Sequence, residues 1–204
     1  MNAALLATAA ILGFLAFFEP CTIATHTLFA ARAHRAGRRQ RAIALAQLML
    51  ARTGLLALIF GAAAAVGLTA WPEALALFML GAIGLVYLVT RKIYLPVPHL
   101  EFFRLIPRHD GFSQGLQLGL TLPACTLPLV LIVGILSALT RQPAVAALAG
   151  FAFAAMFTLP TLWGCTHGMD SVARGFLGKA ASLSPYVTTA LLWGAAFLLW
   201  KTGV

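Results

Sequence analysis

The sequence of 204 residues carries very little charge. Only 9% of its residues are charged, and five of those are acidic. A soluble domain contains about 25% charged residues, so this composition excludes a soluble globular fold. Because 61% of the residues are hydrophobic, the chain is predicted to be an all-α polytopic membrane protein.

The N-terminal apolar run also lacks the features of a cleaved signal peptide. Residues 2–18 have no positive segment before them, and the apolar character continues to about Ala30. This run is therefore predicted to be the first membrane helix, retained in the mature protein. The net charge of +9 comes from Lys and Arg between apolar runs, where they set orientation in a lipid bilayer. We expect no nucleic-acid partner.

Six segments are long and apolar enough to cross a hydrocarbon core, which takes about 20 residues. They are residues 3–29, broken near Pro20, and 43–68, 71–90, 112–139, 144–165 and 183–200. The basic residues gather in alternate loops, those after the first, third and fifth spans. Positive loops stay cytoplasmic, which predicts a bacterial inner-membrane protein with both termini in the periplasm.

Three spans in each half produce two repeats of opposite orientation. The predicted single membrane domain, 1–204, then consists of inverted halves 1–90 and 112–201, joined by a cytoplasmic link at 91–111. Cys21-Thr22-Ile23 aligns with Cys125-Thr126-Leu127, which superposes the first helix of each half. Broken helices at matching positions of inverted repeats indicate a central site and alternating access.

Both of these stretches combine a cysteine with a helix-breaking proline. Pro20 precedes Cys21, whereas Pro123 and Pro128 flank Cys125. A proline can occupy the first position of a restarted helix, as Pro20 is predicted to do before Cys21 and Pro123 before Cys125. The free N–H groups there favour the thiolate, the reactive form of cysteine. The alternative is that each cysteine is a small apolar filler. Three cysteines are too few for a disulfide scaffold.

Four other residues stand out inside the apolar runs. Glu19 is predicted to be a helix cap, a proton carrier for Cys21 or the partner of Arg52, and Arg52 alternatively extends to the membrane surface. His26 follows Cys21 by five residues. Cys165 is expected to serve packing, with a shuttle thiol as the alternative. These residues have no tight ligand spacing, so no metal site is predicted.

Pro160, in the fifth span, has Gly150 and Gly164 around it. This combination is typical of either a hinge or a closely packed helix.

The six spans, the inverted halves and the Pro-flanked cysteines together resemble the CcdA family, small relatives of the DsbD membrane domain within the LysE-type superfamily. The resemblance covers essentially the whole chain and includes Pro160 in the fifth span. It implies that Cys21 and Cys125 cycle between dithiol and disulfide. Electrons would pass from cytoplasmic thioredoxin to a periplasmic thioredoxin-like acceptor, without haem, flavin or metal. Ala24 stands where the family has a further proline, and Glu19 replaces a small residue.

The expected function is therefore transmembrane electron transfer by thiol–disulfide exchange, with Pro20, Thr22, Pro123, Thr126 and Pro128 supporting the two cysteines. The downstream pathway stays open between cytochrome c biogenesis, disulfide isomerase reduction and metal-stress repair. Two alternatives remain. One is a LysE-type exporter of a solute or soft metal ion that uses Glu19, His26 and Arg52. The other is an assembly subunit with structural thiols.

Overall fold

The computed structural model describes residues 2–66, 73–90, 100–101, 114–168 and 171–202. These residues form an all-helical fold, as predicted, with one short pair of strands. The helices are α1 (Asn2–Phe17), α2 (Pro20–Arg35), α3 (Arg38–Val66), α4 (Glu73–Thr90), α5 (Gln114–Gly119), α6 (Leu127–Thr140), α7 (Pro143–His167) and α8 (Ser171–Thr202). Each predicted span coincides with one or more of them. Most of the predicted link at 91–111 lies outside the described residues.

Two of the described helices, α3 and α7, are long and apolar enough to cross a membrane. The pair α1 and α2 makes a third candidate if the two are counted as one bent span, with an angle of 75° between them. Two or three membrane-spanning helices therefore follow from length and composition. The count of six stays a prediction.

The break expected near Pro20 is present. Pro20 begins α2, and Glu19 before it has extended backbone angles of φ −64° and ψ 136°. Proline has no N–H to donate to the preceding turn, so α1 cannot continue through it. The predicted first span is thus divided into two helices, as the sequence indicated.

The second break is more extensive than predicted. After α5 the chain forms strand β2 (Thr121–Leu122) and a 3₁₀ turn, η2 (Ala124–Thr126), before α6 begins. Pro128, not Pro123, occupies the first turn of α6. The prediction that Pro123 starts the second half-helix is therefore wrong, because the 3₁₀ turn separates Pro123 from the helix. Cys125 lies within that turn.

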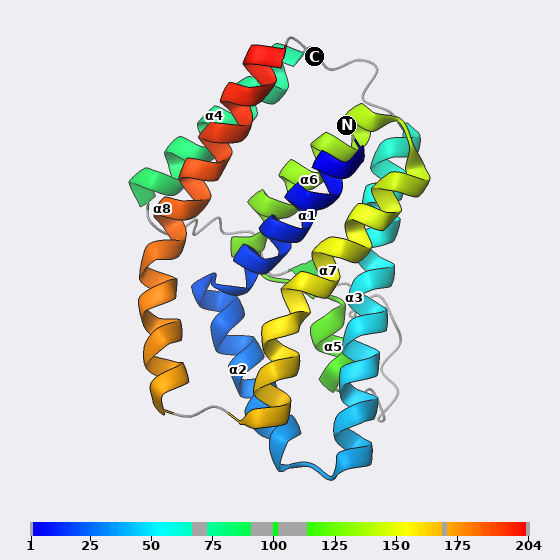
Figure 1. The fold of residues 1–204 in the computed structure, drawn as a ribbon, viewed down its shortest axis with the longest axis vertical. Coiled ribbons are helices and arrows are strands. Elements are labelled where there is room, and N and C mark those ends of the chain that lie inside the picture. Colours follow the sequence, from blue (N-terminus) through cyan, green and yellow to red (C-terminus); the bar gives the residue numbers. More distant parts are fainter. Residues whose placement is uncertain (1, 67–72, 91–99, 102–113, 169–170, 203–204) are drawn as a thin grey trace.

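The long helices α3 and α7 lie side by side along most of their length (Figure 1). Their apolar contact includes Phe60, Phe153 and Phe157, all fully buried. At Gly150 the backbones meet so closely that an added Cβ would lie 2.6 Å from the nitrogen of Ala57. Gly150 thus belongs to a closely packed helix. α7 continues unbroken through Pro160.

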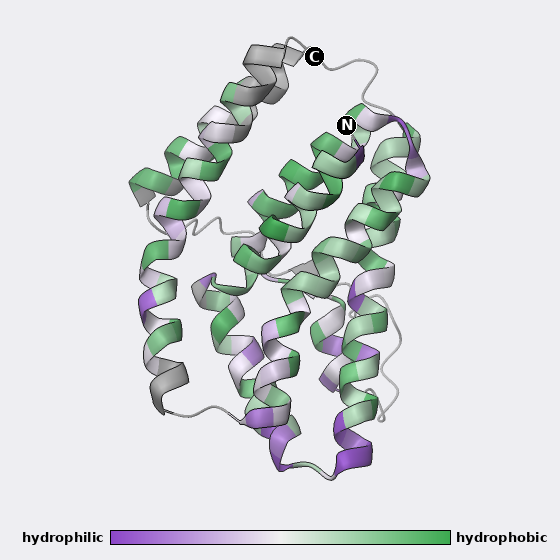
Figure 2. Cartoon of the chain, viewed as in Figure 1, coloured by the Kyte–Doolittle hydropathy of each residue, from purple (hydrophilic) through white to green (hydrophobic). Residues whose placement is uncertain are grey.

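The helices are largely apolar along their length (Figure 2). Large side chains such as Leu50, Leu58 and Phe151 are exposed, whereas hydrophilic residues concentrate at the turn between α2 and α3. Apolar patches of this extent mark surfaces that meet a partner or lipid. Here they accord with a membrane protein.

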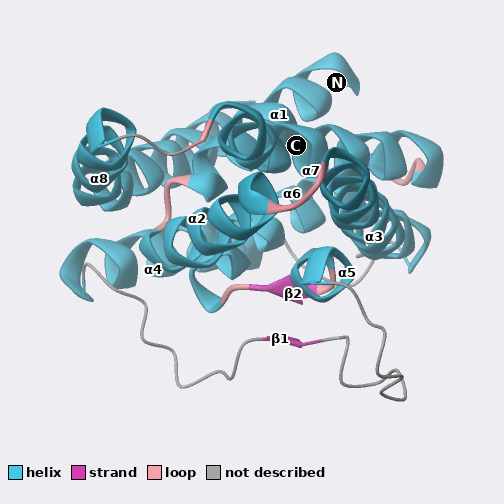
Figure 3. Ribbon diagram, turned by 90° about the horizontal axis from the view of Figure 1, so that it is seen from below, coloured by secondary structure: helices cyan, strands magenta, loops and turns pink. Residues whose placement is uncertain are grey.

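No sequence pattern indicated the strand pair. Strand β1 (Leu100–Glu101) pairs antiparallel with β2, and Figure 3 shows it at the edge of the helices beside α5. Backbone that leaves a helix must find other hydrogen-bond partners. The pairing supplies them next to the second break.

Candidate redox site

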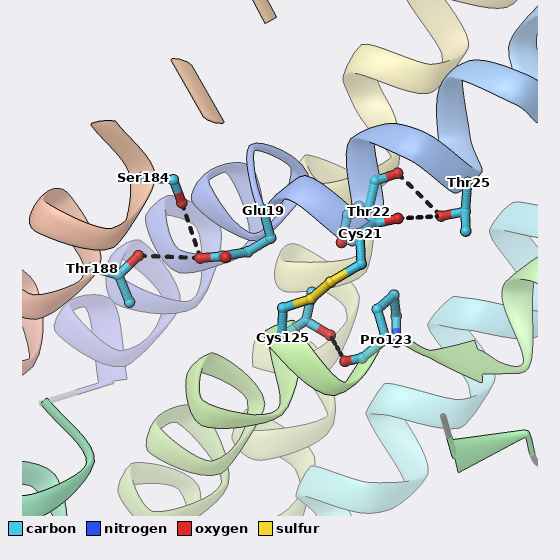
Figure 4. The surroundings of a disulfide bond; sticks show 9 residues. Glu19, Cys21, Thr22, Thr25, Pro123, Cys125, Ser184 and Thr188 are labelled. Carbon is cyan, nitrogen blue, oxygen red and sulfur yellow. Dashed lines mark hydrogen bonds between the residues drawn. A yellow bond between two sulfur atoms is a disulfide. The ribbon is translucent and has the colours of Figure 1, made fainter. Parts of the chain in front are cut away.

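Cys21 and Cys125 form a disulfide that joins the two breaks (Figure 4). Their Cα atoms are 6.8 Å apart, although 104 residues separate them in the sequence. Cys21 lies in the first turn of α2, and Cys125 lies in η2 just before α6. The bond therefore connects the two stretches that the sequence singled out, with the pairing that the family resemblance implied.

The two Cys-Thr pairs have different surroundings. Both cysteines are partly buried, and the threonine after each is fully buried. The hydroxyl of Thr126 donates to the carbonyl of Pro123 at 2.8 Å, which stabilises the 3₁₀ turn. The hydroxyl of Thr22 has no hydrogen-bond partner among the described residues. Thr126 therefore fixes the backbone around its cysteine in a way that Thr22 does not.

Glu19 is buried, with 1% of its surface exposed, and its carboxylate points toward α8 (Figure 4). It accepts hydrogen bonds from Ser184 at 3.0 Å and Thr188 at 3.4 Å. Although Glu19 is the N-cap residue of α2, its side chain makes no capping hydrogen bond. Glu19 thus lies at the predicted cap position without a side-chain cap, and its predicted pairing with Arg52 is wrong, because Arg52 has other partners.

Arg52 lies on α3 and is fully buried, so the prediction of a side chain that extends to the membrane surface is wrong. It donates to the carbonyl of Leu118 on α5 at 2.8 Å and contacts Nε2 of His26 on α2 at 3.2 Å. Its guanidinium carbon lies 4.3 Å from the ring centre of Phe157 on α7, a cation–π distance. One side chain therefore contacts three other helices.

The contacts of His26 fix its tautomer. An arginine can only donate, so Nε2 of His26 accepts from Arg52 and the ring hydrogen is on Nδ1. Nδ1 then donates to the hydroxyl of Thr161 at 2.5 Å. Thr161 directly follows Pro160, which places the predicted proline of the fifth span next to this polar cluster. His26 is a neutral, hydrogen-bonded link between α2 and α7.

Cys165 is fully buried among apolar side chains of α2 and α3, which include Phe29, Ala30 and Leu48. This position fits the packing role that the sequence favoured. Among the residues that the structure describes, no three His, Cys, Asp or Glu side chains lie close enough together to hold a metal ion.

Sequence reasoning missed the partners of the polar residues. Ser184, Thr188 and Thr161 are all hydroxyl residues within apolar helices, a pattern that is typical of hydrogen bonds between membrane helices. Ser184 and Thr188 are four residues apart, so they occupy one face of α8. That spacing was a usable signal. No sequence signal could identify the Leu118 carbonyl as the acceptor of Arg52, because any residue can supply a backbone carbonyl.

Comparison of the chain with protein-family models, with curated proteins and with solved structures finds no match. The chemistry of the site itself is therefore the basis for assigning a function.

Proposed function

We propose that this protein transfers reducing equivalents across the bacterial cytoplasmic membrane by thiol–disulfide exchange at Cys21 and Cys125. The disulfide between the two helix breaks is the observation that carries the proposal. A disulfide placed only for stability has no need of helix breaks in two apolar segments. The breaks put both sulfur atoms at ends of helical segments, where backbone N–H groups are unpaired and favour thiolates.

The reaction requires no cofactor. A thiolate of reduced cytoplasmic thioredoxin attacks one sulfur of the Cys21–Cys125 disulfide, and the other cysteine leaves as a thiolate. The second thioredoxin thiol then resolves the mixed disulfide. This step yields oxidised thioredoxin and a Cys21/Cys125 dithiol, so two electrons and two protons are transferred. The same exchange in reverse reduces the disulfide of a periplasmic thioredoxin-like acceptor.

Two inverted repeats would let the same pair react on both faces of the membrane, and the packing supports them. In the predicted alignment α5 corresponds to α1, α6 to α2, α7 to α3 and α8 to α4. The contact of α1 with α7 then has its counterpart in α5 with α3, and that of α2 with α7 in α6 with α3. The pairs α3–α7 and α4–α8 correspond to themselves. This exchange of partners is typical of a twofold relation between halves.

The distribution of charge supports the orientation with both termini in the periplasm. The turn between α2 and α3 and the start of α8 lie toward one end of the molecule, and the turn between α6 and α7 lies toward the other (Figure 1). The first end carries five arginines, which are Arg32, Arg35, Arg38, Arg39 and Arg41. Positively charged turns face the cytoplasm, so thioredoxin would approach from that end.

Trapping of the mixed disulfide tests this proposal. A thioredoxin that lacks its resolving cysteine is incubated with inside-out membrane vesicles, and adducts are detected by non-reducing electrophoresis. We expect one adduct, which is absent from both C21S and C125S, because neither variant can form the disulfide that the thioredoxin thiolate attacks. A solute or metal exporter predicts a different result, namely no adduct and a transport activity that C21S weakens without abolishing it.

A further inference from the structure

Arg52 joins the two broken spans on one side of the disulfide. Its contact on the first span is His26, five residues beyond Cys21, and its contact on the second is Leu118, seven residues before Cys125. Both α2 and α5 extend from the disulfide toward the end of the molecule that carries the arginine-rich turn (Figures 1 and 2). Arg52 thus contacts both helices on the side from which thioredoxin is proposed to approach.

The other side of the disulfide is closed in a different way. There α1 contacts α6 and α7 through apolar residues such as Leu5, Leu12 and Val133, all buried. Separation of these residues would expose only apolar surface. Separation of α2 from α5 would instead expose a charged side chain to water. The free energy of separating the helices therefore differs between the two sides of the disulfide.

The charge of Arg52 has no counter-ion among the described side chains. The chain has five acidic residues, and Glu19, the one whose side chain is described, accepts hydrogen bonds from Ser184 and Thr188 instead. The Nε atom of Arg52 has no hydrogen-bond partner among the residues that the structure describes. Burial of a cation is unfavourable because hydration is lost. The contacts to Leu118, His26 and Phe157 offset that loss only in part.

We propose that Arg52 is the positioning residue that controls cytoplasmic access to the Cys21–Cys125 disulfide. While α2 and α5 are together, its guanidinium contacts both and orders the backbone on either side of the sulfur atoms. When they separate, water hydrates the guanidinium and compensates for the contacts that are lost. This inference rests on the proposed redox function, for which it names the means of access.

Two substitutions have opposite expected effects. His26→Phe keeps a ring but removes the acceptor of Arg52, which leaves a buried cation with fewer partners and favours the open form. Arg52→Met keeps the volume but removes the charge. The open form then loses the hydration of a cation, and this loss outweighs the two buried acceptors, Leu118 and His26, that are left without a donor in the closed form. A residue that served packing alone would produce changes of the same sign in both variants.

The measurement is the rate at which a membrane-impermeant phosphine reduces the disulfide in sealed vesicles of known orientation. From the cytoplasmic face, we expect H26F to react about tenfold faster than the wild type and R52M about tenfold slower, since a hydrogen bond to a charged group is worth about one factor of ten or more. From the periplasmic face, neither variant should react faster. Equal directions of change in the two variants, or equal changes from both faces, overturn the proposal.

Ser137→Ala is the matched control. Ser137 is fully buried on α6 and its hydroxyl has no partner among the described residues, so its loss should leave both rates unchanged. If H26F fails to fold, Thr161→Val replaces it, because it removes the group that holds Nδ1 of His26. T161V should also speed cytoplasmic reduction, and no change in its rate would count against the proposal.

Reduction by the phosphine tests the role of Arg52, whereas reduction by thioredoxin tests the proposed function. If the two variants change its rates in opposite directions while thioredoxin reduces no form of the protein, the access role stands and the electron-transfer function fails. If thioredoxin reduces the wild type but the variants change in the same direction, the function stands and the role of Arg52 fails.

Discussion

Substitution of Gly150 by Ala tests whether α3 and α7 form the closely packed helix pair on which the site is built. A Cβ at Gly150 would lie 2.6 Å from the nitrogen and 2.7 Å from the Cα of Ala57. Carbon atoms in good contact are about 3.5–4.0 Å apart, so the two helices must separate by about 1 Å. The atoms that would have to move belong to the backbone, and rotation of a side chain cannot relieve the overlap.

The cost follows from known effects of overpacking. Extra methyl groups in a well-packed core destabilise by about 1–3 kcal/mol, and a gap of about 1 Å removes up to half of the attraction between facing atoms. Alanine in place of glycine within a helix contributes about 0.5–1 kcal/mol in the opposite direction. For G150A we expect the free energy of unfolding to fall by about 0.5–2 kcal/mol.

Gly54→Ala is the matched control on α3. Gly54 is exposed, and an added Cβ there meets no atom within 4 Å, so G54A should raise the free energy of unfolding by about 0.5–1 kcal/mol. Both variants have the same gain in helix propensity. The difference between them therefore isolates the steric cost, about 1–3 kcal/mol.

The assay is reversible unfolding of the purified protein in mixed micelles, with the free energy obtained by linear extrapolation from the denaturant dependence. Equal stabilities of G150A and G54A would refute the reasoning, since Gly150 could not then contact the backbone of α3. A stable G150A that still forms the disulfide would likewise show that the site does not depend on this close approach.

Three further predictions concern the surroundings of the disulfide. Thr22→Val should change the free energy of unfolding by less than about 0.5 kcal/mol, whereas Thr126→Val should lower it by about 1 kcal/mol, because only Thr126 loses a hydrogen bond; equal effects in denaturant unfolding would contradict this. Ser184→Ala removes the 3.0 Å bond to Glu19 and should cost about 1–2 kcal/mol by the same assay, and an unchanged stability would mean that this contact does not form. Cys165 is fully buried, so an impermeant maleimide should leave it unlabelled in the folded protein, and C165A should retain full thiol–disulfide exchange; rapid labelling or lost exchange would point to a redox role.

The helical fold and the first break could be predicted because their causes are local. The low charge and long apolar runs require helices with internally satisfied backbone, and Pro20 ends α1 at a definite place. The start of α6 was misplaced because two prolines, Pro123 and Pro128, compete for the same role. The sequence could not show that η2 would intervene between them.

The contacts of the site were predictable only in part. The pairing of Cys21 with Cys125 was expected from a family resemblance, because spacing alone does not specify a disulfide over 104 residues. Glu19 and Arg52 are both isolated charges in apolar runs, which made a pair between them reasonable. In the structure they have separate partners on α8 and on α2, α5 and α7. Such choices depend on helix packing, which no local pattern encodes.

The central claim is that Cys21 and Cys125 form a disulfide that thioredoxin reduces from the cytoplasmic side. It is tested most directly by intact-protein mass after acid quenching and alkylation, with C165A as the background so that only these two thiols remain. The oxidised protein should take up no label. After reduced thioredoxin is added to inside-out vesicles, two labels should appear together. Two labels on the protein under oxidising conditions, or no label after thioredoxin treatment, would contradict the account.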